Sequence, residues 1–227
     1  MTIHIGMLLY PGLTQLDLTG PFEVLHRVPD ARVHLLWKNL EPVVADSKLA
    51  LGPTATLASC PDLDVLFVPG GHGQLLLMQD EEVIGFLRDA GRKARFVTSV
   101  CTGALLLGAA GLLEGYEAAT HWAFMDLLPM FGARPVRKRV VSDRNRITGG
   151  GVTAGIDFGL TLAARLSTEA VAKGIQLGLE YDPEPPFQCG HPDVAEAAIV
   201  AVVRQRFDQT FRARASQIAC VLKPRAG

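Results

Sequence analysis

The sequence lacks a strong excess of charge of either sign. Among its 227 residues, 22 are Lys or Arg and 23 are Asp or Glu, which gives a formal net charge of −1. A chain with so little net charge has no overall basic field that would hold nucleic acid or an anionic membrane surface. We therefore expect no nucleic-acid partner.

Long apolar runs are also absent. No segment approaches the roughly 18 consecutive apolar residues of a membrane span. The N-terminal stretch MTIHIGMLLYPG has neither a basic region nor a small-residue cleavage site, so it is not typical of a signal peptide. These absences predict a protein without a membrane partner and with a cytoplasmic location.

Cysteine is scarce, and its spacing shows no pairing pattern. The four cysteines are Cys60, Cys101, Cys189 and Cys220. None forms a C-x-x-C pair or has zinc-ligand spacing with a histidine, which argues against a metal site and a disulfide framework. Each thiol is therefore judged by its own surroundings. Outside Cys101 these are loop or helical contexts, where a buried filler is the expected role.

The sequence does contain apolar, strand-like runs that alternate with helical runs. Strands are expected at 3–10, 31–37, 64–71, 95–100, 117–120 and 135–148, with a hairpin at 42–57. Helices are expected at 14–28, 81–93, 102–113, 122–131, 152–166 and 168–179. This alternation predicts an α/β fold with a mainly parallel sheet covered on both faces. With no repeat and no linker, residues 1–227 are predicted to form one domain, in which 193–220 is a C-terminal docking helix.

Cys101 lies where the apolar run FVTSV meets the helical run ALLLGAAG. The stretch Ser99 to Gly103 is the thiol version of a nucleophile elbow, in which small residues two positions away on either side let the chain turn tightly. Such a turn puts the thiol at a helix N-terminus, where unpaired N–H groups and the helix dipole stabilise a thiolate and lower its pKa. The pattern favours a nucleophile, with a buried filler as the alternative.

Two glycine-rich stretches follow other predicted strands. The N–H groups of VPGGHG (68–73) could form an oxyanion hole, and a plain tight turn is equally consistent. TGGGVTAG (148–155) lacks the lysine of a P-loop, so we interpret it as a helix start packed against the sheet. Because ligands bind at the carboxyl ends of parallel strands, we expect Gly70, Gly71 and Cys101 at one edge of the sheet.

Three further groups have competing interpretations. Thr14 and Asp17 have the spacing of a capping box, whereas an Asp17 carboxyl beside the thiol would titrate with it and stay protonated as an acid. His121 follows a predicted strand and is either a base or, more commonly for such a position, a structural group. The arginines of VVRQRFDQTFRARA (202–215) are interpreted as a solvated helix face.

These motifs carry a resemblance. The elbow TSVCTGALLLGAAGLL, with VPGG upstream and ITGGGVTAGIDF downstream, resembles the ThiJ/PfpI superfamily of class I glutamine amidotransferase-like proteins. More narrowly, YPGLTQLDLTGP, THW and EYDPEPPF resemble the isonitrile hydratases, and the likeness runs from about residue 3 to at least residue 187. The resemblance implies a flavodoxin-like three-layer sandwich, usually a homodimer, with the elbow cysteine as its functional centre.

The resemblance also implies roles for individual residues. Most superfamily members place a glutamate beside the cysteine, whereas this sequence offers Asp17, as isonitrile hydratases do. PfpI-type peptidases have a histidine directly after the cysteine, and Thr102 at this position argues against a protease. The implied reaction hydrates an isonitrile to an N-substituted formamide through a Cys101 thioimidate, with Asp17 as acid and base. Thr102 would orient Cys101 or Asp17, Gly71 and Gly103 would contact the substrate, and no metal or organic cofactor is required.

Two alternatives remain beside this interpretation. The first is a glyoxalase- or deglycase-like enzyme of the same superfamily, against which Asp17 counts because those enzymes usually use glutamate. The second is a non-catalytic redox- or ligand-sensing domain, since the resemblance extends to the N-terminal domains of AraC-type regulators. Such regulators need about 100 further residues with two helix-turn-helix units, for which the chain offers one long helix.

Overall fold

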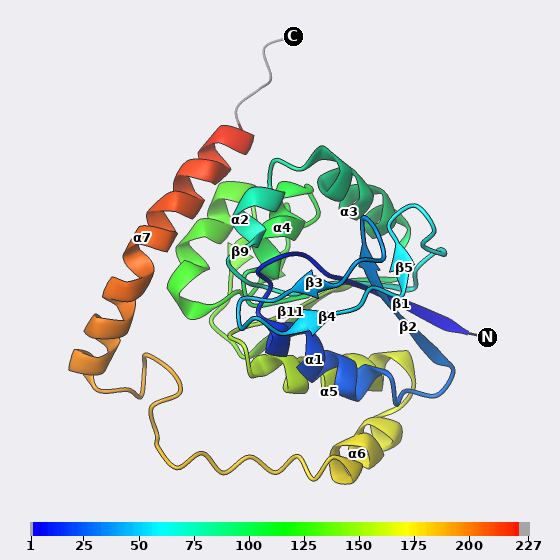
Figure 1. The fold of residues 1–227 in the computed structure, drawn as a ribbon. Coiled ribbons are helices and arrows are strands. Elements are labelled where there is room, and N and C mark those ends of the chain that lie inside the picture. The colour runs from blue at the N-terminus through cyan, green and yellow to red at the C-terminus, as the bar shows by residue number, and fades with distance from the viewer. Residues whose placement is uncertain (1, 223–227) are drawn as a thin grey trace.

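The computed structural model describes residues 2–222 and contains a seven-stranded central sheet (Figure 1). The strand order is β10-β11-β7-β6-β1-β2-β5, and every neighbouring pair is parallel except β10 with β11. The strands are β1 (Ile3–Leu8), β2 (Ala31–Trp37), β5 (Ala55–Thr56), β6 (Val65–Val68), β7 (Phe96–Val100), β10 (Val140–Asp143) and β11 (Arg146–Gly149). Each residue of β6, β7 and β11 is buried, as expected for parallel strands covered on both faces.

Helices cover both faces of the sheet and complete three layers. In Figure 1, α1 and α5 lie on one side of the sheet and α3 and α4 on the other. The helices are α1 (Gln15–Leu25), α2 (Gln74–Leu77), α3 (Glu81–Lys93), α4 (Gly103–Ala109), α5 (Ala154–Leu166), α6 (Glu169–Gly178) and α7 (Ala197–Val221), with a 3₁₀ helix η1 (Trp122–Phe131). The predicted α/β three-layer sandwich with a mainly parallel sheet is confirmed.

Capping, charge and apolar spacing explain the start and the orientation of α3. The Asp80 side chain caps α3 by accepting the Val83 N–H at 3.2 Å, with acidic residues in the first turn and basic residues in the last. These charges complement the helix dipole. Val83, Ile84 and Leu87 form its buried face, so the amphipathic pattern in the sequence fixes which side meets the sheet.

Several predicted elements differ in detail. The helix expected over 102–113 ends at Ala109, and the chain then turns through Gly111 at a φ of 74°. The segment 122–131 is a 3₁₀ rather than an α-helix and contains Pro129, which cannot donate an N–H. The helix expected over 193–220 begins at Ala197.

Two small sheets lie outside the main one. The predicted hairpin within 42–57 is present as β3 (Val43–Val44) paired antiparallel with β4 (Ala50–Leu51). The strand expected near 117–120 is β8 (Glu117–Ala118), which pairs with β9 (Arg134–Pro135) instead of joining the central sheet. Across residues 2–222, every helix falls short of the length and apolar character that crossing a membrane requires.

Candidate active site

Cys101 stands on a sharp turn between β7 and α4. It has a φ of 55°, a left-handed conformation that is strained for a residue with a side chain. Its N–H donates to the carbonyl oxygens of Gly149 (3.1 Å) and Gly150 (2.8 Å), and its own carbonyl accepts the Thr120 hydroxyl at 2.7 Å. These bonds hold the strained residue in place, and the predicted elbow is present.

The surroundings of Gly103 explain why the elbow has a small residue on its helical side. A Cβ at this position would collide with the Val68 carbonyl oxygen and lie 2.8 Å from that of Pro69. Only a glycine therefore lets the first turn of α4 approach the end of β6 so closely. In the resting structure Gly103 acts through packing.

Asp17 lies beside the thiol rather than capping its helix. Thr14, the residue before α1, makes no capping bond through its side chain and donates its hydroxyl to Asp46 at 2.7 Å instead, so the capping-box interpretation is wrong. Asp17 itself is fully buried, and its Oδ2 accepts the Gly70 N–H at 3.0 Å.

The position of Gly70 brings the carboxyl and the thiol together. A Cβ at Gly70 would lie 2.6 Å from Asp17 Oδ2 and 2.8 Å from Cys101 Cβ. Both side chains therefore flank the same point, which the absent side chain of Gly70 leaves clear. Asp17 Oδ1 is buried and has no hydrogen-bond partner among residues 2–222.

The glycine turn after β6 uses its N–H groups to position other residues. The Gly70 N–H holds Asp17, the Gly71 N–H donates to Thr102 Oγ1 at 3.1 Å, and the Gly73 N–H donates to the Gly12 carbonyl at 3.2 Å. An oxyanion hole made of free N–H groups is therefore not present at these positions. The Thr102 hydroxyl contacts Gly71 and not Asp17.

Burial controls the titration of the acid. It raises the pKa of Asp17 from 3.8 to about 7, with hydrogen bonds from the Cys101 side chain and the Gly70 N–H opposing the rise and the Asp46 charge adding to it. At neutral pH this carboxyl is close to its midpoint. It can therefore both give and accept a proton.

The thiol differs from the sequence-based expectation. Burial raises the pKa of Cys101 well above its usual value of 9.0, and the neighbouring Asp17 raises it further. The Thr102 N–H and the positive charge of Arg214 act in the opposite direction. The expected lowering of the thiol pKa at the helix N-terminus is wrong, because Cys101 is only 6% exposed and burial outweighs the local effect of the helix.

His121 behaves as a structural group. Its Nδ1 accepts the Ala123 N–H at 3.3 Å at the start of η1, and its ring centroid lies 5.1 Å from that of Phe207. Burial, with the charge of Arg214, lowers the pKa of His121 to about 4, so the ring is neutral at neutral pH.

Arg214 is a buried polar residue that sequence reasoning missed. It was grouped with the solvated arginines of 202–215, but only 2% of it is exposed, whereas Arg204 and Arg212 are exposed as expected. It donates to Gln74 Oε1 at 2.9 Å and to the Gly71 carbonyl at 3.2 Å. The sequence does contain a signal for the burial of Arg214. The inward-facing stripe of α7 comprises residues spaced three or four apart, namely Phe207, Phe211, Arg214 and Ile218.

A cavity of about 530 Å³ adjoins the elbow. Its floor includes Gly150, whose carbonyl accepts the Cys101 N–H. The start of α5, η1 with the two residues before it, residues 137–139 and Arg204 of α7 line the rest, together with Gly190, His191 and Pro192 from the segment between α6 and α7. Cys101, Asp17 and Thr102 are not among the residues that line it, and Gly150 connects it to the elbow.

The remaining sequence features are structural. A Cβ at Gly149 would lie 3.2 Å from Val100 of β7 and 3.4 Å from Phe158 of α5, and one at Gly155 would lie 2.9 Å from Pro21, so these glycines allow α5 to pack closely against the sheet, as predicted, and also against α1. Cys60 and Cys189 are partly exposed, and Cys220 is exposed, so the buried-filler interpretation is wrong for Cys220. Within residues 2–222, no group of three or more His, Cys, Asp or Glu side chains is arranged to hold a metal ion.

Together, the fold and the site define a three-layer α/β protein with a cysteine on a nucleophile elbow and a carboxyl beside it. The model of the DJ-1/PfpI family matches residues 4–165, and the chain belongs to this family. The chain is 54% identical over 214 residues to the isonitrile hydratase of Pseudomonas putida, and the match covers 94% of each protein.

Two further comparisons show how far along the chain the similarity extends. A crystal structure of a ThiJ/PfpI family protein from Pseudomonas syringae superimposes with a TM-score of 0.94 at 45% identity, covering 96% of this chain and 91% of that one. The HTH-type transcriptional regulator GbdR of Pseudomonas aeruginosa is 33% identical over 169 residues, which cover 71% of this chain but 46% of the regulator. The similarity to the regulator thus concerns less than half of that protein.

Proposed function

We propose that this protein is an isonitrile hydratase, a lyase that adds water to an isonitrile and releases an N-substituted formamide. The observation that carries the proposal is the buried pair of Cys101 and Asp17 around Gly70. The proposal is further supported by the 54% identity, over nearly the whole chain, to an isonitrile hydratase. An aspartate that titrates near neutral pH suits a reaction in which one carbon accepts a nucleophile and a proton.

In the first step, the Cys101 sulfur attacks the isonitrile carbon. The single proton of the thiol–carboxyl pair passes through Asp17 to the same carbon, so that one C–S bond and one C–H bond form. The product is a thioimidate, R–N=CH–S–Cys101, next to an Asp17 carboxylate.

Hydrolysis of the thioimidate restores the pair. The Asp17 carboxylate takes a proton from water as the water oxygen bonds to the carbon, and gives that proton to the nitrogen. The intermediate R–NH–CH(OH)–S–Cys101 then collapses: the C–S bond breaks, the hydroxyl proton moves to Asp17, and the formamide and the thiolate separate. The sequence of steps asks for no metal or organic cofactor.

The neighbouring residues have supporting roles in this proposal. The Thr102 N–H lies toward the sulfur and lowers the pKa of the thiol, and its hydroxyl is fixed by the Gly71 N–H. Gly71 contacts substrate only when this N–H leaves Thr102, and Gly103 contributes by keeping the elbow close to β6. The organic substituent of the isonitrile occupies the cavity beside Gly150.

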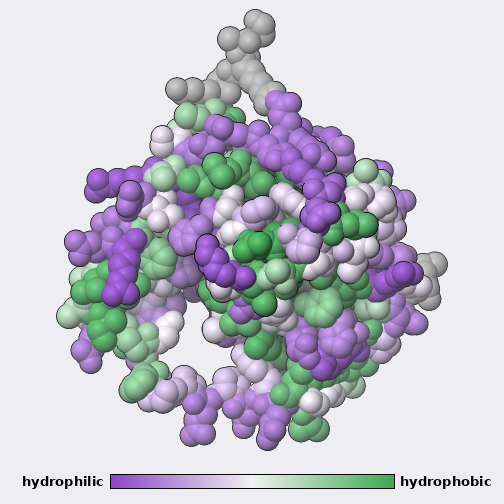
Figure 2. Space-filling model, in the orientation of Figure 1, coloured by the Kyte–Doolittle hydropathy of each residue, from purple (hydrophilic) through white to green (hydrophobic). Residues whose placement is uncertain are grey.

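We assign the active form as a cytoplasmic homodimer in which residues 1–227 act as one unit. In Figure 2, the chain between α6 and α7 stands off the body and leaves an opening behind it. This segment and the start of α7 expose apolar side chains, namely Phe187, Val194, Ile199 and Val202. A second copy would cover them. Light scattering after gel filtration should give twice the 24.4 kDa of one chain, and a monomer would contradict the assignment.

The function is tested with cyclohexyl isocyanide by following formamide formation. The wild type should turn over, Cys101→Ala should lose at least about 10⁴-fold in kcat, and Cys220→Ala, which removes an exposed thiol, should keep the wild-type rate. A Cys101→Ala protein with an unchanged rate would disprove the mechanism. If the wild type made no formamide but consumed methylglyoxal, the glyoxalase-like alternative would replace the proposal.

A further inference from the structure

Helix α7 lies outside the part of the chain that the family model matches, which ends at residue 165. It docks alongside η1 (Figure 1), where Phe207 lies 5.1 Å from the ring of His121 and 5.6 Å from that of Phe124. Phe211 stacks on Phe124 at 6.5 Å. These aromatic contacts fix the rotation of α7 and so determine which of its residues points inward.

Arg214 is the residue that this rotation buries. Its guanidinium lies 4.2 Å from the centroid of Phe124, Nε donates to Gln74 Oε1, and Nη2 donates to the Gly71 carbonyl. Nη1 is buried without a hydrogen-bond partner, as is Nε2 of Gln74. Within residues 2–222, Arg214 forms no ion pair with any carboxylate.

A buried guanidinium without a counter-ion is unfavourable for folding. Arginine keeps its proton even so, since the pKa of a guanidinium stays far above neutral. The positive charge of Arg214 therefore persists in the core of the molecule. A negative charge that forms nearby during the reaction would compensate this buried positive charge.

The contacts of Arg214 lead directly to the thiol–carboxyl pair. The Gly71 carbonyl that it binds belongs to the residue whose N–H holds Thr102, next to Cys101. Gly70, one residue earlier, holds Asp17. Arg214 thus binds a carbonyl of the same turn whose N–H groups hold Asp17 and Thr102.

The titratable groups around the thiol come from three directions. Asp17 approaches from α1, Tyr10 follows β1, and Arg214 comes from α7, while Asp46 acts on Asp17 and Tyr10. Of these, only Arg214 favours the thiolate, and its charge also acts on the neutral ring of His121.

We propose that Arg214 is a positioning residue of the hydration reaction: through the Gly71 carbonyl it fixes the turn whose N–H groups bind Asp17 and Thr102, and its charge stabilises the thiolate of Cys101. The proposal rests on the function proposed above. It assigns to α7, an element outside the family-matched region, a direct part in the chemistry of the elbow.

The experiment measures alkylation of Cys101 by iodoacetamide between pH 6 and 10, with mass spectrometry resolving the Cys101 peptide from the other three cysteines. Because only the thiolate reacts, the rate below its midpoint falls tenfold for each unit by which the thiol pKa rises. Arg214→Met should react at least about tenfold more slowly than the wild type at pH 8. Arg214→Lys should recover most of this loss, because the charge is retained.

Two controls are matched to this variant. Arg212→Met removes an exposed arginine of the same helix, and Arg146→Met removes a buried arginine elsewhere, so both should keep the wild-type alkylation rate. In isonitrile turnover, Arg214→Met should lower kcat by at least tenfold with little change in KM. A folded Arg214→Met protein with the wild-type alkylation profile would overturn the proposal.

Gln74→Glu keeps the test decisive if Arg214→Met fails to fold. It places a carboxylate against Nε of Arg214, 2.9 Å from the present amide oxygen, and pairs the charge without removing the arginine. Alkylation of Cys101 should slow by a similar factor, and an unchanged rate would again overturn the proposal. Alkylation needs no isonitrile, so its outcome is independent of whether the protein hydrates isonitriles.

Discussion

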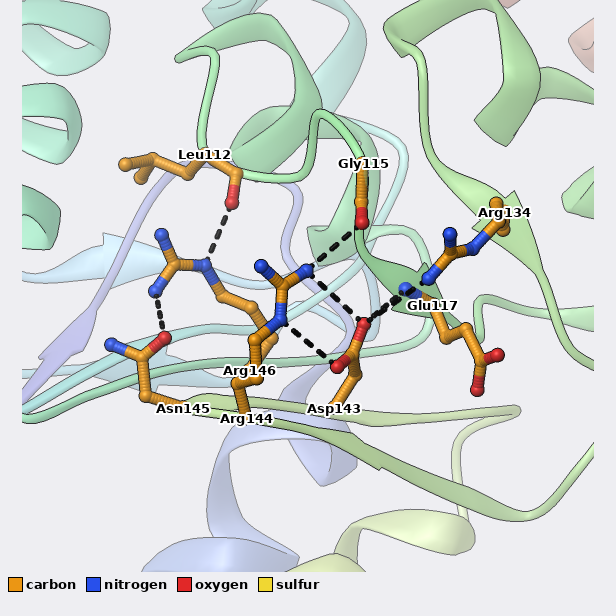
Figure 3. A network of polar contacts seen from close by, with 8 residues as sticks. All are labelled: Leu112, Gly115, Glu117, Arg134, Asp143, Arg144, Asn145 and Arg146. Atoms are coloured by element: carbon orange, nitrogen blue, oxygen red, sulfur yellow. Dashed lines mark hydrogen bonds and ion pairs between the residues drawn. The ribbon is translucent and has the colours of Figure 1, made fainter.

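Among residues 2–222, two arginines are buried, and their hydrogen-bonding groups are satisfied in different ways. Arg146, on β11, is 7% exposed, donates to the Leu112 carbonyl at 2.7 Å and to Asn145 Oδ1 at 2.8 Å, and stacks on Tyr116. Figure 3 shows it next to Arg144 and Asp143 in a network that joins β10 and β11 to the loop after α4.

Arg214 is buried more deeply, and one of its buried nitrogens has no hydrogen-bond partner. It makes two hydrogen bonds, keeps Nη1 without a partner and lies close enough to Cys101 to act on the titration of the thiol. The difference indicates that Arg146 serves the fold, since carbonyl and amide oxygens bind it in the resting state. Arg214 instead lowers the pKa of the Cys101 thiol, the group that becomes a thiolate in the proposed reaction.

The largest effect on turnover is expected at the turn after β6, whose Gly71 carbonyl binds Arg214. Gly70→Ala would put a methyl group 2.6 Å from Asp17 Oδ2 and 2.8 Å from Cys101 Cβ, forcing the two apart. Turnover should fall about 10³-fold, because a misplaced proton donor loses most of the advantage of its orientation. Gly85→Ala, in the middle of α3 with nothing within 4 Å of the new Cβ, should leave turnover unchanged. Equal activity of the two variants would show that the close approach at Gly70 is irrelevant.

Asp17 is the carboxyl of the site and is bound by the Gly70 N–H. Because its pKa is about 7 in the fold and 3.8 in the unfolded chain, the folded state holds the proton more tightly. Its contribution to stability is therefore greatest at low pH and declines as the pH rises from about 4 to about 7, by up to about 4 kcal/mol.

The variant Asp17→Asn should lose most activity and also lose this part of the pH dependence. Urea unfolding at pH 5 and pH 8 measures it: the wild type should lose more stability than the variant between the two values. If the wild type and Asp17→Asn changed in parallel with pH, Asp17 would not be the buried carboxyl that titrates near neutrality.

The sequence could predict the half of the site that depends on local pattern. The elbow at Cys101 follows from small residues at fixed offsets between a strand and a helix, and the parallel sheet then brings Gly70 and Gly71 to the same edge. The identity of Asp17 as the acid needed the family resemblance, because its spacing from Thr14 equally suits a helix cap.

The other half of the site depends on packing between residues that are far apart in the sequence. Arg214 meets Gln74 and Gly71 across more than 130 residues of sequence, and only the docking of α7 on η1 decides that it faces inward. The titration of Cys101 was predicted with the wrong sign for the same reason. The helix N-terminus is a local feature, whereas the burial that outweighs it comes from several elements.

Replacing Arg146 tests whether this arginine contributes to the stability of the fold and not to the site. Arg146→Met removes both hydrogen bonds and leaves the Leu112 carbonyl without its partner, so the free energy of unfolding should fall by about 3 kcal/mol. The alkylation profile of Cys101 and the KM for isonitrile should stay as in the wild type. A shifted thiol midpoint in this variant would mean that any buried arginine changes the site through the fold, and the contrast with Arg214 would be lost.

The smallest effect is expected for Arg144, the exposed neighbour in the same network. It binds Asp143 at 3.1 Å and the Gly115 carbonyl at 2.9 Å, but more than half of its side chain is in solvent, where ion pairs contribute little to stability. Asp143 also keeps its bond from the Glu117 N–H at 2.8 Å when Arg144 is replaced. Arg144→Gln, which preserves a side chain at the position with a φ of 54°, should therefore leave the urea midpoint within error of the wild type. A loss as large as that of Arg146→Met would show that the network, rather than burial, determines what an arginine contributes here.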